Sequence, residues 1–104
     1  MMDTPFVCNM TVLSADEREH YNRLLTSLNE NRQAVKELDD GYAFRYKVDS
    51  QTIRDAAEFI AYERLCCPFF DFELAVEHDT NRLWLRLRGQ DGIKDFIRLE
   101  FDIE

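Results

Sequence analysis

Glycine and proline are scarce in this chain, with three and two residues in 104, and no segment is repetitive or of low complexity. Disordered and collagen-like chains are rich in these residues, so the composition excludes both classes. The 45% of hydrophobic and 33% of charged residues are typical of a globular protein. We expect a single domain over residues 1–104 that forms its core without needing a disulfide or a metal.

Long apolar segments are absent as well, since no run approaches the roughly 18 residues that a membrane span needs. The first residues, 1–5, have neither the basic region nor the apolar stretch of a signal peptide. We therefore expect a cytoplasmic protein with no membrane contact and with its three cysteines, Cys8, Cys66 and Cys67, reduced. An odd number of cysteines also argues against a purely structural disulfide scheme.

Basic residues are the minority, 13 against 21 acidic ones, which gives a formal net charge of −8. Nucleic-acid binding depends on Lys and Arg contacts to phosphates, so the charge argues against a nucleic-acid partner. An acidic surface attracts cations or a basic partner instead. The sequence contains no motif for binding a nucleotide or a phosphate, and none for hydrolysis.

Three segments have the periodicity of amphipathic helices. A Ser-x-x-Glu capping box at Ser14 opens the first, which runs to about Asn31. Asp49 or Ser50 caps the second, which stops at Cys66 because Pro68 disfavours helical geometry at the residue before it. Asp91 is expected to cap the third. The predicted buried stripes are Tyr21, Leu24, Leu25 and Leu28 on the first helix, Ile53, Ala56, Ala57 and Ile60 on the second, and Ile93, Phe96, Ile97 and Phe101 on the third.

The segments between these helices alternate in the manner of strands. Residues 34–38 and 42–48 form one predicted hairpin with a tight turn at Asp40-Gly41, and residues 72–76 and 83–87 form a second around the polar residues 78–81. Residues 6–13 are expected to be a short strand or an extended arm. The predicted fold class is α+β: an antiparallel sheet of about four strands, in two hairpins, with the helices packed on one face.

The strongest functional signal is the adjacent pair Cys66 and Cys67 at the end of the second helix. Glu63 lies one helical turn earlier, so the three side chains occupy neighbouring positions. Thiolates bind soft or borderline ions such as Zn(II), Cu(I) and Hg(II), and a carboxylate can complete a zinc shell. An N-terminal arm can fold back across the helix end and bring Cys8. We predict that Cys8, Cys66, Cys67 and Glu63 bind zinc or another soft metal ion, in a protein that binds or senses that ion.

Two alternatives stay open. Cysteine is often buried as a small hydrophobe, and we expect one of the pair to face the core. The chain is then a non-catalytic interaction module that dimerises or docks a protein partner through the strand face carrying Trp84. An enzyme that uses a thiol nucleophile needs a lowered thiol pKa, which the carbonyls of a helix end and Glu63 both oppose, so no catalytic residue is predicted.

Disulfide chemistry is constrained by sequence spacing. A trans peptide holds the Cα atoms of Cys66 and Cys67 about 3.8 Å apart, below the usual range of roughly 4.4–6.8 Å for a disulfide. Redox pairing of Cys8 with either of the two remains open.

The motifs Glu63-Arg64-Leu65-Cys66-Cys67-Pro68-Phe69 and Asp40-Gly41-Tyr42-Ala43-Phe44, with an upstream cysteine like Cys8, resemble a family of short bacterial proteins that share an E-x-x-C-C-P-F block. The resemblance covers nearly the whole chain. Some members are encoded near heavy-metal resistance or metal-responsive regulator genes, which implies a connection with soft metals. No established activity comes with the family, so the resemblance transfers no catalytic residue.

Overall fold

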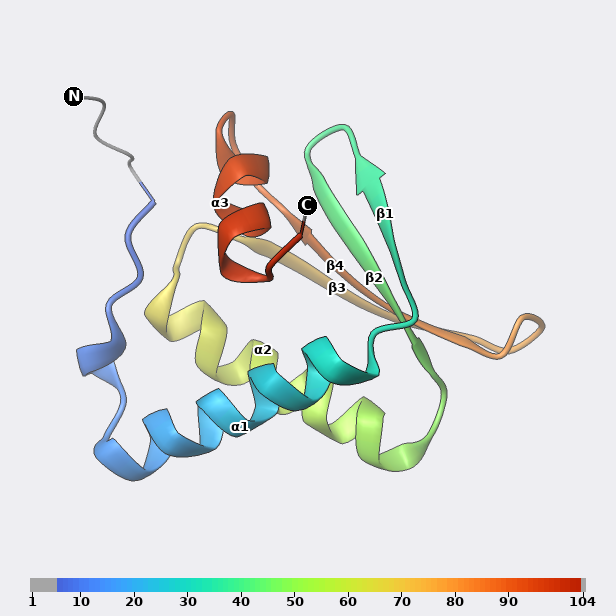
Figure 1. Cartoon of the computed structure of the whole chain (residues 1–104), viewed down its shortest axis with the longest axis horizontal. Helices are drawn as coiled ribbons and strands as arrows, with labels where there is room; N and C mark the ends of the chain where they lie inside the picture. Colours follow the sequence, from blue (N-terminus) through green and yellow to red (C-terminus); the bar gives the residue numbers. More distant parts are fainter. Residues whose placement is uncertain (1–5, 104) are drawn as a thin grey trace.

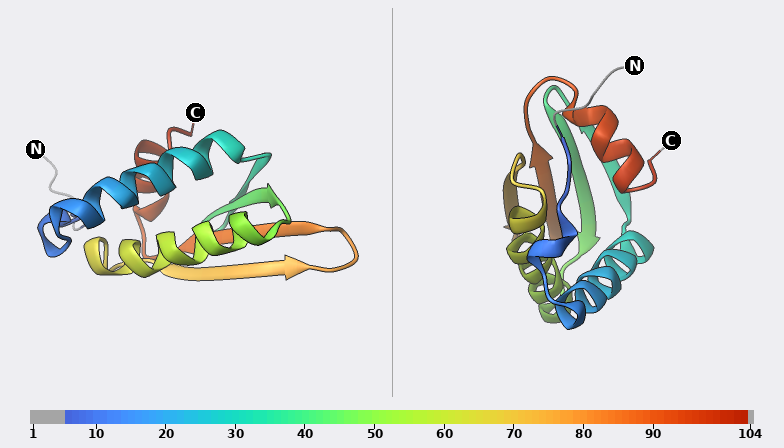
Figure 2. Two further views of the ribbon diagram at one scale, coloured as in Figure 1. Left: turned by 90° about the horizontal axis from the view of Figure 1, so that it is seen from below. Right: turned by 90° about the vertical axis from the view of Figure 1, so that its left-hand side faces the viewer.

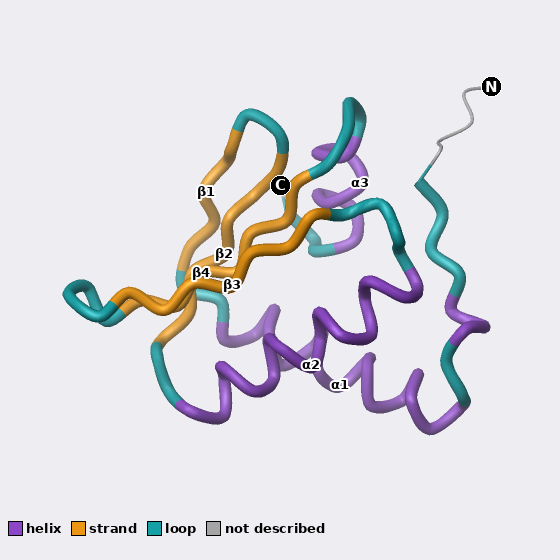
Figure 3. The backbone as a smooth tube through the Cα atoms, turned by 180° about the vertical axis from the view of Figure 1, so that it is seen from behind, coloured by secondary structure: helices purple, strands orange, loops and turns teal. Residues whose placement is uncertain are grey.

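Three α-helices, a short 3-10 helix and four strands make up residues 6–103, the part of the chain that the structure, a computed structural model, describes (Figure 1). In chain order they are η1 (Met10–Val12), α1 (Ala15–Asn31), β1 (Ala34–Leu38), β2 (Gly41–Lys47), α2 (Ser50–Cys66), β3 (Asp71–Glu77), β4 (Arg82–Arg88) and α3 (Ile93–Glu100). The predicted α+β class and the predicted order of helices and hairpins are confirmed. The segment before α1 is an extended arm interrupted by η1, as Figure 3 also shows.

The starts of α1 and α2 follow from local side-chain chemistry. Ser14 and Glu17 form the predicted capping box, in which each side chain accepts a hydrogen bond from the other residue's backbone N–H, at 3.2 and 2.8 Å. Asp49 caps α2 by accepting from the backbone N–H of Thr52 at 2.8 Å.

Within residues 6–103, no helix is both long and apolar enough to cross a bilayer.

The start of α3 differs from the prediction that Asp91 caps it. Gly92 occupies the N-cap position with a φ of 93°, and no side chain caps the helix. A left-handed φ is readily adopted by glycine because it has no Cβ. The turn geometry that Gly92 permits therefore sets the start of α3, one residue later than the Asp91 cap implies.

The strands form one antiparallel sheet in the order β1-β2-β4-β3, so the two hairpins meet along β2 and β4. The β1–β2 connection is Asp39-Asp40, because Leu38 already pairs with Gly41, and neither aspartate has a positive φ. The tight turn predicted at Asp40-Gly41 therefore lies one residue earlier, at Asp39-Asp40. Gly41 is required for another reason: a Cβ there would collide with the backbone carbonyl of Leu87 on β4.

The core lies between the helices and one face of the sheet, which we call the inner face (Figures 1 and 2). Phe101, which follows α3, packs on Phe44 of β2 at 5.0 Å and on Phe59 of α2 at 5.9 Å between ring centroids. Burying each such ring contributes up to about 3 kcal/mol. On α2 the fully buried positions are Ala56, Phe59, Glu63 and Cys66, whereas Ala57, which the periodicity placed in the stripe, is exposed.

Candidate functional site

Cys8 and Cys67 form a disulfide that joins the N-terminal arm to the end of α2, with their Cα atoms 4.4 Å apart. The backbone supports the same approach, since the N–H of Asn9 donates to the carbonyl of Cys66 at 2.7 Å. The ring of Phe6 also packs on Phe69, beyond the helix end, at 5.0 Å between centroids. The arm thus folds back as the sequence allows and brings Cys8 to Cys67, and the expectation that all three cysteines are reduced is wrong for this structure.

Cys66 lies apart from that bond. Its side chain is buried in the hydrophobic core and its thiol is free. Burial, together with the neighbouring charges of Glu63 and Glu100, raises the pKa of the Cys66 thiol above its ordinary value. Cys66 is thus the core-facing member that we expected of the pair, and its environment opposes the formation of a thiolate.

Glu63 is the fully buried carboxylate of the site. Its Oε1 accepts a hydrogen bond from the Tyr21 hydroxyl at 2.6 Å and lies 3.4 Å from the sulfur of Cys67. Burial and the adjacent Glu63 raise the pKa of Tyr21, so the phenol stays protonated and remains a donor. Because a sulfur in a disulfide carries no hydrogen, the contact with Cys67 is a van der Waals contact.

Glu100 is the second carboxylate, and the sequence reasoning missed it. Its Oε2 lies 3.5 Å from the sulfur of Cys8 and 3.9 Å from that of Cys67. The pKa of Glu100 is raised to about 10, mainly because the carboxyl group is buried. A hydrogen bond with Glu63 and the negative charge of Glu63 raise it further. Glu63 Oε2 and Glu100 Oε1 are buried and have no other hydrogen-bond partner among the described residues. At neutral pH Glu100 therefore stays protonated, and its proton is available to be shared with Glu63 in a hydrogen bond.

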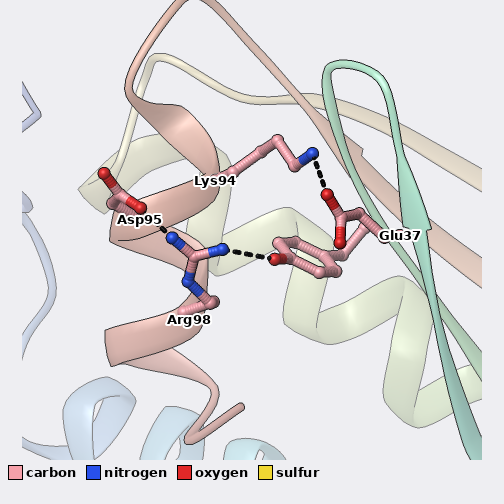
Figure 4. Close-up of polar contacts among 5 residues, drawn as sticks. Glu37, Lys94, Asp95 and Arg98 are labelled. Atoms are coloured by element: carbon pink, nitrogen blue, oxygen red, sulfur yellow. Dashed lines mark hydrogen bonds and ion pairs between the residues drawn. The ribbon is translucent and has the colours of Figure 1, made fainter. Parts of the chain in front are cut away.

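Glu100 is the last residue of α3, so the docking of that helix on the sheet sets its position. Figure 4 shows polar contacts that join α3 to the sheet. Lys94 forms an ion pair with Glu37 of β1, and the Arg98 guanidinium donates to the Tyr42 hydroxyl of β2 at 2.9 Å. These contacts join the partly buried side chains of Lys94 and Arg98 to the sheet, while Ile97 packs into the core. The last turn of α3 then brings Glu100 to the sulfurs. A sequence signal existed, because a glutamate seven residues after Ile93 and three after Ile97 lies on the helix's apolar face.

The structure therefore brings together three of the four predicted ligands, Cys8, Cys67 and Glu63, and adds Glu100. The sulfurs of Cys8 and Cys67 and a carboxylate oxygen of Glu100 all lie within 4.8 Å of one another. Within residues 6–103, this is the only group of three or more cysteine, histidine or acidic side chains with that spacing. Cys66, the fourth predicted ligand, is not part of the group.

Comparison with known proteins gives no further assignment. No protein-family model, no curated protein and no solved structure matches the chain. The functional argument therefore rests on the chemistry of the Cys8–Cys67 disulfide and of the two carboxyl groups beside it, Glu63 and Glu100.

Proposed function

We propose that the dithiol form of this protein binds a thiophilic metal ion, with Zn(II) as the simplest candidate, through Cys8, Cys67 and Glu100. The observation that carries the proposal is the convergence of two sulfurs and a carboxylate oxygen within 4.8 Å, from three segments distant in sequence. Zinc with thiolate bonds of about 2.3 Å in a tetrahedral shell separates its ligand atoms by roughly 3.8 Å. The sulfurs of Cys8 and Cys67, which are bonded to each other here, must therefore move apart on reduction before both can bind the ion.

Glu63 is the candidate for a fourth ligand, because its Oε1 already lies 3.4 Å from the sulfur of Cys67. The pair of buried carboxyls supports a cation on electrostatic grounds. Neither Glu63 nor Glu100 forms an ion pair with a Lys, Arg or His side chain of residues 6–103. Carboxylates buried without a counter-ion are costly, and a divalent cation between them and two thiolates would offset that cost.

Metal binding and the disulfide exclude each other, because both use the same two sulfurs. A phosphine reductant breaks the bond to give two thiols, and it becomes the phosphine oxide by taking its oxygen from water. The thiols then release their protons when the metal binds. Metal binding is therefore expected only after reduction.

The test is native mass spectrometry of phosphine-reduced protein with Zn(II), alongside Co(II) absorption, which reports thiolate ligation directly. We expect one Zn(II) per chain in the reduced wild type and in Cys66→Ser, and none in oxidised protein. The Cys8→Ser/Cys67→Ser double variant should also bind none. Reduced wild type that binds no more metal than the double variant would remove the proposal.

A second proposed function is docking of a protein partner, or of a second copy, on the sheet face that carries Trp84. One observation favours it: the helices cover the inner face alone, and within the described residues no helix lies over the opposite side of the β3–β4 hairpin (Figure 2, left). Trp84 is only half-buried there. Size-exclusion chromatography with light scattering measures whether this face makes a homodimer.

A further inference from the structure

The sheet face opposite the core, here called the outer face, combines side chains from all four strands. Cross-strand partners lie on the same face of a sheet, so the register assigns its members. Lys36, Ala43, Arg86 and Glu73 form one row across the sheet, and Arg45 and Trp84 belong to the next. The basic members of the outer face are Lys36, Arg45, Lys47, Arg82, Arg86 and Arg88.

Charge is strongly segregated by this arrangement. Six of the 13 basic side chains of the chain lie on the outer face, whereas only three of its 21 acidic ones do, Asp71, Glu73 and Glu77 on the edge strand β3. The outer face is thus net positive although the chain has a net charge of −8. A local potential of opposite sign to that of the whole protein steers a partner of complementary charge to that face.

The positive charges of the outer face are largely uncompensated. Arg88 forms ion pairs with Asp40 at 2.9 Å and Glu73 at 2.7 Å. Within residues 6–103, the other five basic side chains form no ion pair. Glu77 partly offsets two of them: its carboxylate accepts hydrogen bonds from Thr80 at 2.7 Å and from the indole N–H of Trp84 at 3.0 Å, and the nearby charges of Arg86 and Arg82 also help to lower its pKa.

A shallow groove of about 310 Å³ crosses the outer face among these cations. It is lined by the apolar side chains of Leu38 and Ala43, the latter 1% exposed, and by Lys36, Glu77, Thr80, Arg82, Trp84 and Arg86. The Arg86 guanidinium lies over the Trp84 ring, 5.7 Å from its centroid. The groove thus combines apolar side chains with one carboxylate and three cations that form no ion pair among the described residues, and this excess of positive charge suits an acidic chain that also carries aliphatic side chains.

We propose that the outer face binds an acidic segment of another protein, with carboxylates paired to Arg45, Arg82 and Arg86 and an aliphatic side chain against Trp84. The proposal names the partner class for the second proposed function and is independent of the metal site. Single-stranded nucleic acid fits less well, because its binders stack successive bases on several aromatic rings and the outer face has one. Two copies placed outer face to outer face would oppose like charges.

Trp84 is the only tryptophan of the chain, so in the folded protein its fluorescence reports binding at the outer face. The probe is a labelled ten-residue peptide with six Glu and two Leu. Its control is the same peptide with Gln in place of every Glu. A 12-nucleotide single-stranded DNA is tested in parallel. We expect the acidic peptide to change the Trp84 emission and its label anisotropy. Its affinity should weaken as salt is raised.

The matched variants are Arg45→Glu/Arg86→Glu on the outer face and Arg54→Glu/Arg64→Glu on α2, where both arginines are exposed and form no ion pair. Arg45→Glu/Arg86→Glu should weaken binding of the acidic peptide at least tenfold, and Arg54→Glu/Arg64→Glu less than twofold. The loss of affinity in Arg45→Gln/Arg86→Gln should lie between these two values. Four outcomes would each overturn the proposal. Both charge-reversal variants could lose peptide affinity equally, or the Gln peptide could bind as well as the Glu peptide. The single-stranded DNA could bind more tightly than the Glu peptide, or the protein could form a dimer that protects Trp84. Zinc binding by the same reduced variants is measured separately, because a failure of the peptide-binding proposal leaves zinc binding unchanged and a failure of the metal-site proposal leaves peptide binding unchanged.

Discussion

Glu100, buried beside Glu63, should make the oxidised protein less stable as the pH rises from 5 to 8. The pKa of Glu100 is raised to about 10 in the folded protein, from an ordinary value near 4.5. A raised pKa means that the folded state holds a proton which the unfolded chain releases. The stability is then complete below about pH 4.5 and is lost progressively as the pH rises toward 10.

The magnitude follows from the slope for one proton, about 1.4 kcal/mol per pH unit. Over the three units from pH 5 to pH 8 the free energy of unfolding should therefore fall by about 4 kcal/mol. This is a large share of the roughly 5–15 kcal/mol that stabilises a typical domain. Glu37, Asp49 and Glu77 do not interfere, because their lowered pKa values place their effects below that range.

Urea denaturation of oxidised protein at pH 5, 6, 7 and 8, followed by Trp84 fluorescence, measures the slope. Glu100→Gln keeps the shape of the side chain and cannot ionise, so it should flatten the dependence to within about 1 kcal/mol over the same range. Glu73→Gln, an exposed carboxylate on β3, is the matched control and should keep the wild-type slope. A wild-type stability that is constant from pH 5 to 8, or a Glu100→Gln variant with the same slope, would refute the shared proton.

Three further predictions concern the cysteines and the sheet. Reducing the Cys8–Cys67 disulfide, which spans 59 residues, should lower the free energy of unfolding by about 4 kcal/mol in urea titrations, and a reductant should not alter the double serine variant. Gly41→Ala should cost about 1–3 kcal/mol in thermal unfolding, because the new methyl group meets the Leu87 carbonyl; an unchanged melting temperature would disprove that contact. In oxidised protein the free Cys66 should react with a thiol dye only after unfolding, so rapid labelling in native buffer would contradict its burial.

Much of the fold was predictable because its signals are local. The capping box at Ser14, the alternation in β2 and the stop imposed by Pro68 each depend on residues that are neighbours in sequence. The errors occurred where tertiary packing decides. Gly41 looked like a turn residue, but the backbone of β4 passes too close for any side chain.

The candidate site was half predictable for the same reason. Cys67 and Glu63 lie within one helical turn, so their spacing could be read from the sequence. Glu100 approaches them only because α3 docks on the sheet, a long-range arrangement with no local signature beyond a glutamate on an apolar helix face. Cys66 could not be separated from Cys67 by sequence, since adjacent residues at a helix end point in different directions that only the packed core defines.

The two forms of the sulfur pair imply two electrostatic states of the carboxyls. With the disulfide closed, the raised pKa of Glu100 keeps a proton on its carboxyl group and so lowers the negative charge of the site. A divalent ion held by two thiolates and Glu100 would remove the reason for that proton, because the buried negative charge would then have a counter-ion. Glu63 and Glu100 are thus explained in both states, whereas a disulfide alone gives no reason to bury two carboxyls beside it.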